Sequence, residues 1–260
     1  MSGICGLIHC DGAPVDPAAL KGMASAAIHR GPDGVTYWSG DGAGLAYLAL
    51  YITPESFNER QPQVSPQGDH VLCADARIDN RDELIAALRT KADLRQVEPT
   101  DADLILAAYR AWGTDCATHL IGDFAFAIWD TVQRRLFAAR DAMGMRTLYY
   151  RIEPKRLLFA TEAKQILALP DVPVQPFEPA ICMHLSGPLG RPEWSFYDGI
   201  AQLAPAYALV AEASGHRTWR YWDIDEFDMR MTMPMCTISG RFFKRRYDAD
   251  CAVSSPWDSP

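Results

Sequence analysis

Short apolar runs, separated by glycine, proline and acidic turn residues, alternate along this chain and predict mainly β-strands. The first run starts at residue 1 (MSGICGLI) and ends at a turn formed by Asp11 and Gly12. Residues 123–129 (DFAFAIW) are apolar on both alternating faces, which predicts a strand covered on both sides. Further strands are expected at residues 35–39, 44–52, 70–78, 135–139, 147–152, 156–160, 206–211 and 217–222.

Helix start signals fall between these strands. An acid followed by proline at residues 16–17 is typical of a capped helix start. Thr100 with Asp103, and Asn80 with Glu83, have the spacing of capping boxes that begin two more helices.

The remaining pattern completes the expected fold. A short helix is predicted over residues 163–169, whereas residues 170–192 are rich in proline and glycine and are expected to be irregular. Many strands buried on both faces, with a few helices between them, predict an α+β fold of two packed antiparallel sheets with helices outside.

The last segment differs from the rest. Residues 1–222 are expected to form one domain, and residues 223–260 an aberrant tail in which no amphipathic period persists. Two interpretations stay open for this tail: a frameshifted gene, or a natural disordered extension.

Composition excludes several classes of protein. The 260 residues are 48% hydrophobic and 22% charged, as in an ordinary globular chain. A formal net charge of -8 argues against binding to nucleic acid or anionic membranes. There is no apolar run of membrane-spanning length and no signal-peptide pattern. The seven cysteines lack paired or zinc-binding spacing, so we expect a cytoplasmic protein with reduced thiols and no bound metal.

Several segments resemble, in the same order, motifs of glutamine-hydrolysing asparagine synthetases. The resemblance covers roughly residues 1–222. It implies a class II glutamine amidotransferase domain with the N-terminal-nucleophile (Ntn) hydrolase-like fold, a four-layer α-β-β-α sandwich. The matching segments are residues 1–7 (MSGICGL), 29–34 (HRGPDG), 122–130 (GDFAFAIWD), 140–144 (RDAMG) and 159–164 (FATEAK).

The resemblance places the family's nucleophilic cysteine at Ser2. Removal of Met1 would leave Ser2 with a free amine that can act as base for its own side chain. A serine hydroxyl is a much poorer nucleophile than a thiol. Cys5 is an odd number of residues away, so it is expected on the opposite face of the strand and cannot replace the missing cysteine.

The substrate positions implied by the resemblance are also changed. The arginine that holds the substrate carboxylate corresponds to Ala49, next to Leu50, and alanine cannot form a charge-assisted clamp. The oxyanion-hole Asn-Gly pair corresponds to Asp75 and Ala76, and an ionised aspartate offers no donor. Only the acid that holds the substrate amine is kept, as Asp101. We therefore predict a vestigial pocket that binds glutamine weakly or not at all.

Three functional hypotheses follow. In lacking the cysteine, the chain resembles β-lactam synthetases and lasso-peptide cyclases, whose amidotransferase-like domain supports an ATP-using amide-forming domain. The first hypothesis is such a non-catalytic domain, truncated before its synthetase part, with no cofactor of its own and with ATP and Mg expected only for the missing part. The second is an active glutaminase or serine-type Ntn hydrolase that uses Ser2. The third is a stand-alone binding module for a synthetase or peptide partner.

Overall fold

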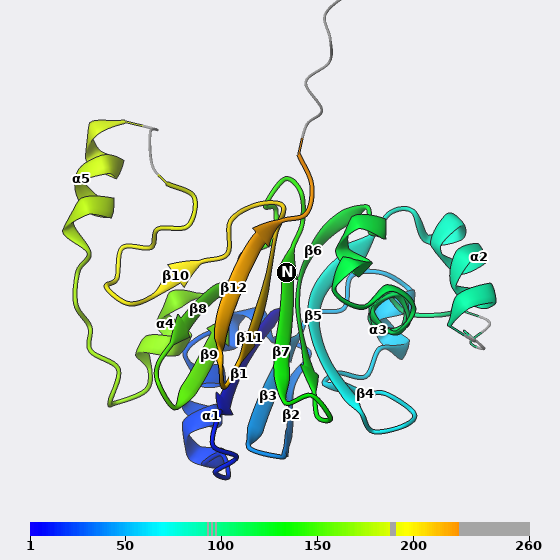
Figure 1. The fold of residues 1–260 in the computed structure, drawn as a ribbon, viewed down its shortest axis with the longest axis horizontal. Helices are drawn as coiled ribbons and strands as arrows, with labels where there is room; N and C mark the ends of the chain where they lie inside the picture. Colours follow the sequence, from blue (N-terminus) through cyan, green and yellow to red (C-terminus); the bar gives the residue numbers. More distant parts are fainter. Residues whose placement is uncertain (93, 95, 97, 188–190, 224–260) are drawn as a thin grey trace, which may run out of the picture. The chain divides into compact units, whose positions relative to one another are not determined.

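Two six-stranded antiparallel sheets lie face to face in this computed structural model, which describes residues 1–223 except 93, 95, 97 and 188–190 (Figure 1). The first sheet has the order β10 (Ala201–Gln202), β8 (Tyr149–Ile152), β9 (Arg156–Ala160), β1 (Gly3–His9), β3 (Ala43–Ala49) and β2 (Gly34–Gly40). The second has the order β12 (Gly215–Arg220), β11 (Tyr207–Glu212), β7 (Arg135–Arg140), β6 (Gly122–Asp130), β5 (His70–Ile78) and β4 (Gln63–Val64).

Helices cover the outer face of each sheet. α1 (Pro17–Ser25) and α4 (Ala163–Leu167) pack on the first sheet, and α2 (Arg81–Lys91) and α3 (Asp101–Trp112) on the second. The order of layers is therefore helix, sheet, sheet, helix, as the sequence and the resemblance predicted. None of the helices in the described part of the chain is long and apolar enough to cross a membrane.

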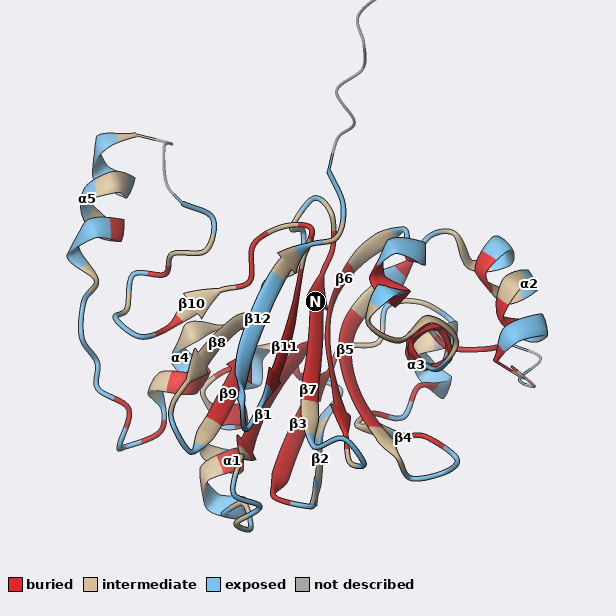
Figure 2. Cartoon of the chain, in the orientation of Figure 1, coloured by how far each residue is buried: buried red, intermediate tan, exposed pale blue. Residues whose placement is uncertain are grey.

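The core lies in the layer between the sheets and in the two layers beneath the helices. Figure 2 shows the central strands as the most buried part of the chain. Along β6, Phe124 and Phe126 pack towards the helices, whereas Ala125 and Ala127 face the other sheet. The strand is thus covered on both sides, as its apolar pattern predicted.

One predicted capping box forms and the other does not. Thr100 and Asp103 make the reciprocal pair at the start of α3. The box expected at Asn80 and Glu83 is wrong. The Asn80 side chain instead accepts a hydrogen bond from the Ile121 N–H (3.0 Å) and donates one to the carbonyl of His119 (3.0 Å), so it ties α2 to the start of β6.

Two other expectations need correction. Residues 170–192 contain a helix, α5 (Glu178–Ser186). Pro179 does not prevent it, because the proline lies in the first turn, where a missing N–H costs nothing. The strand expected over residues 44–52 ends at Ala49, since the Leu50 N–H donates to the Ser2 hydroxyl instead of to a neighbouring strand. The tail expected from residue 223 onward lies outside the described residues apart from Asp223.

Gly6 in β1 tests the packing between the sheets. A Cβ at Gly6 would lie 2.3 Å from the ring of Phe159, which is fully buried. We expect Gly6→Ala to lower the free energy of unfolding by about 2 kcal/mol, because overpacking forces its neighbours to move. Urea unfolding should show no such loss for Gly22→Ala in α1, because a Cβ added at Gly22 would meet nothing within 4 Å. Equal stability of the two variants would contradict this account of the core.

Candidate active site

The start of β1 is held by two of the motif segments. The Ile4 N–H donates to Thr161 Oγ1 (2.8 Å), and the Thr161 N–H donates to the carbonyl of Ile4 (2.9 Å). Arg30 donates through Nη1 to the carbonyl of Ser2 (3.4 Å) and through Nε to the carboxylate of Glu162. The segments at residues 29–34 and 159–164 therefore fix the chain at the predicted nucleophile.

The Ser2 hydroxyl is buried and already hydrogen-bonded. Its Oγ accepts a hydrogen bond from the Leu50 N–H (3.1 Å) and lies 3.3 Å from the carbonyl of Leu50. The same oxygen is 3.2 Å from the phenol oxygen of Tyr47, and only 7% of Ser2 is exposed. Leu50 follows Ala49 directly, so the structure brings three of the predicted positions together.

A chain of buried polar side chains continues from Ser2 across to the second sheet. Tyr47 donates to Glu59 Oε1 (3.5 Å), and the side-chain amide of Gln61 donates to the same oxygen. Gln61 also pairs with the backbone of Ala74 on β5, donating to its carbonyl (2.9 Å) and accepting from its N–H (2.5 Å). We call Ser2, Tyr47, Glu59 and Gln61 the polar bridge.

The charge state of the polar bridge depends on Glu59. Burial raises the pKa of this carboxyl to about 7, and Asp101 and Asp103 act in the same direction, against the hydrogen bond from Gln61 and the amide of Ala102. The sequence analysis missed Glu59, whose neighbours (NERQP) are typical of an exposed loop. Tyr47 could have been found from the sequence, because alternation along its strand places it on the same face as Ala49.

Asp75 introduces a carboxyl into the same end of the layer between the sheets. Only 4% of Asp75 is exposed, and its Oδ2 has no hydrogen-bond partner among the described residues. Burial raises its pKa, whereas Arg146, the amino terminus, Arg30 and the Ser2 amide lower it. Ala76, the next residue, faces the other way and packs against the helices.

Arg146 reaches Asp75 because the segment at residues 140–144 builds a tight turn. Arg146 Nη1 lies 3.8 Å from Asp75 Oδ1. Asp141, which is fully buried, accepts hydrogen bonds from the N–H groups of Met145 and Arg146 (2.9 Å each). The Arg140 guanidinium donates to the backbone carbonyls of this turn and of Leu203, so the motif is structural and positions a cation beside the site.

Asp101, the acid that the resemblance assigns to the substrate amine, already has partners. It lies in the first turn of α3 and forms an ion pair with Arg81. Its Oδ2 accepts a hydrogen bond from the Ile78 N–H (3.3 Å). Glu59 lies between Asp101, whose charge acts on it, and Tyr47, so the polar bridge links the region of Asp101 to Ser2.

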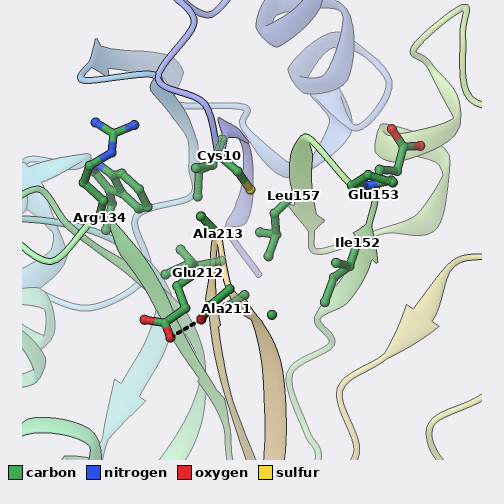
Figure 3. Close-up of a pocket in the computed structure, with 14 residues that line it drawn as sticks. Cys10, Arg134, Ile152, Glu153, Leu157, Ala211, Glu212 and Ala213 are labelled. Atoms are coloured by element: carbon green, nitrogen blue, oxygen red, sulfur yellow. Dashed lines mark hydrogen bonds between the residues drawn. The ribbon is translucent and has the colours of Figure 1, made fainter.

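A separate cavity of about 340 Å³ lies at the opposite end of the layer between the sheets. Figure 3 shows the sulfur of Cys10 pointing towards Leu157, while the charged groups of Arg134 and Glu153 point away from the centre. The cavity is lined mainly by apolar side chains and contains none of the predicted site residues. The candidate active site is therefore the Ser2 end of the molecule.

Comparisons with known proteins show which family of domains the chain resembles. A family model described as glutamine amidotransferase domain matches residues 1–222. The chain is 31% identical over 206 residues to asparagine synthetase [glutamine-hydrolyzing] 3 of Bacillus subtilis, covering 78% of this chain and 33% of that protein. It is 29% identical over 205 residues to amidase chry2 of Gibberella zeae, covering 76% of this chain and 29% of that protein.

Solved structures confirm the fold. Glutamine phosphoribosylpyrophosphate amidotransferase from Bacillus subtilis superposes with a TM-score of 0.60 at 15% identity, covering 85% of this chain and 50% of that one. The chain spans about a third of the length of the two curated relatives described above.

Proposed function

The chain belongs to the class II glutamine amidotransferase domains of the asparagine synthetase family, and we propose that its glutaminase site is vestigial. In this proposal the domain supports an ATP-dependent amide-forming domain, carried in the same chain or on a separate protein, without supplying ammonia. ATP and Mg would serve that synthetase part alone.

The observation that carries this proposal is the chemistry around Ser2. The nucleophile position holds a hydroxyl that is tied to Leu50 and Tyr47, and the position of the carboxylate clamp holds Ala49. The oxyanion position holds the buried carboxyl of Asp75, which repels a developing negative charge when ionised. Loss of one oxyanion donor typically costs about a hundredfold or more in rate, and here three functions are changed together.

An ammonia-release assay with glutamine tests the proposal. We expect no turnover that depends on Ser2, so the unmodified chain and Ser2→Ala should give the same background rate. Ser2→Cys should also stay inactive, because a thiol restores neither the clamp at Ala49 nor the donor at Asp75. Intact-mass measurement should accompany the assay, so that forms with and without Met1 are both scored. Steady turnover that Ser2→Ala abolishes would overturn the proposal.

A second candidate function, serine-type hydrolysis, is favoured by the polar bridge. In this alternative an ionised Glu59 stays beside Tyr47: attack by Ser2 Oγ on a carbonyl carbon passes the serine proton to Tyr47 while the phenol proton passes to Glu59. This route needs no free α-amine. It predicts hydrolysis of small activated esters that is lost in both Ser2→Ala and Glu59→Gln, whereas the vestigial site predicts no difference between these variants and the unmodified chain.

A further inference from the structure

Glu59 links Tyr47, the hydrogen-bond partner of Ser2, to the start of α3. Its carboxyl accepts from Tyr47 and Gln61, and the Ala102 amide at the first turn of α3 faces it. All four residues of the polar bridge are buried. The side chain of Glu59 therefore lies between Tyr47, which contacts Ser2, and the first turn of α3, which carries Asp101.

The groups that face Glu59 make its ionised form hard to keep in place. From β3 it meets the phenol of Tyr47, and from α3 it meets the two acids Asp101 and Asp103. Asp75 on β5 faces Tyr47 in turn. Among the described residues no ion pair forms with the Glu59 carboxyl. Arg60 donates to the backbone carbonyl of Glu59 (3.0 Å) and Arg81 pairs with Asp101, so the hydrogen bonds to the carboxyl come from neutral groups.

The segment that carries Glu59 is well placed to move. It connects β3 to β4, and residues 53–58 are hydrogen-bonded mainly to one another through Thr53 and Ser56. Ile52 and Phe57 on this segment are exposed, so a displacement costs little buried apolar surface. Moving the carboxyl outward would hydrate it and uncover Tyr47 and Ser2.

We propose that Glu59 is a pH-operated gate over the Ser2 site, closed while its carboxyl carries a proton and open once the carboxyl is ionised. The closed state keeps amino-acid amides out of the pocket, so the gate excludes substrate in addition to the changes at Ser2, Ala49 and Asp75. Because the carboxyl ionises near neutral pH, the gate responds within the range in which proteins work.

A thiol placed at residue 2 reports on the gate. Ser2→Cys and Ser2→Cys/Glu59→Gln are treated with iodoacetamide at pH 6 and pH 8, and alkylation of the N-terminal peptide is followed by mass spectrometry. At each pH the alkylation rate of the single variant is divided by that of the double variant, which removes the increase in thiolate with pH that both variants share. We expect a ratio near one at pH 6, and at pH 8 a roughly tenfold faster reaction of the single variant.

If Glu59 became ionised without moving, the alkylation rate at pH 8 would change in the opposite direction. A fixed negative Glu59 would raise the pKa of the nearby thiol and slow the single variant. A ratio of one or less at pH 8 therefore overturns the proposal. Alkylation needs no turnover, so its outcome is independent of the ammonia assay.

Hydrogen exchange provides a second readout in the unmodified chain, which does not depend on either variant folding. The Leu50 N–H, which donates to Ser2 Oγ, should lose about tenfold in protection between pH 6 and pH 8 after correction for intrinsic exchange. Unchanged protection would also overturn the gate.

Discussion

Asp141→Ala should lower the free energy of unfolding by about 3 kcal/mol or more. Asp141 is fully buried and accepts two backbone N–H groups, from Met145 and Arg146, at 2.9 Å each. Alanine would leave both N–H groups without this acceptor and would also remove the charge next to the Arg140 guanidinium. The turn that carries Arg146 to Asp75 would then lose the group that organises it.

Urea unfolding checks this prediction, with two matched variants. Asp141→Asn keeps one good acceptor and should fall between the unmodified chain and Asp141→Ala. Asp171→Ala removes an exposed carboxylate that pairs with Arg156 at 2.7 Å, and should cost less than about 1 kcal/mol. If Asp141→Ala were no worse than Asp171→Ala, the turn would not depend on this buried acid.

The fold was largely predictable because its strands have strong local patterns. β6 is apolar on both faces from Phe124 to Trp129, and β5 matches its predicted range of residues 70–78. The capping box of α3 is a local signal and formed as predicted. The errors lie where distant residues decide: the Asn80 side chain binds residues some forty positions away, and β3 ends early because of a hydroxyl at residue 2.

The site was predictable only in part. Resemblance pointed to Ser2, Ala49, Leu50 and Asp75, and the structure places them together at one end of the layer between the sheets. No local pattern indicated Glu59, because its burial follows from Tyr47 on another strand and from the acids of α3. Their roles in substrate binding remain predictions that the assays above can test.

Two buried acids distinguish the Ser2 end of the molecule. A serine in place of the family's cysteine would account for the loss of thiol chemistry under the proposal above, but not for a carboxyl at Asp75 or a buried glutamate at residue 59. Burying either acid costs free energy. Arg146 lies beside Asp75, and Tyr47 donates a hydrogen bond to Glu59. Their presence is easier to understand if the pocket has acquired its own internal structure in place of a bound amino acid.

Glu59→Gln should stabilise the domain by a much larger amount at pH 8 than at pH 5. The folded-state pKa of Glu59 is about 7, raised from its ordinary value of 4.5 chiefly by burial. A raised acid pKa means that the unfolded chain ionises first, so stability falls as pH rises from 4.5 to 7 and stays low above that range. The loss reaches up to about 3 kcal/mol, at roughly 1.4 kcal/mol per pKa unit, and glutamine removes it because it resembles the protonated acid.

Urea unfolding of both proteins at pH 5 and pH 8 measures this difference, and Glu153→Gln supplies a control of opposite sign. Burial raises the pKa of Glu153, but the hydrogen bonds from Arg156 and Arg151 outweigh it and leave the pKa below its ordinary value. Glu153→Gln should therefore destabilise the domain at pH 8, by a modest amount since the group is near the surface. If Glu59→Gln gave the same change in stability at both pH values, Glu59 would ionise as freely in the folded chain as in the unfolded one, and neither its burial nor its role as a gate could stand.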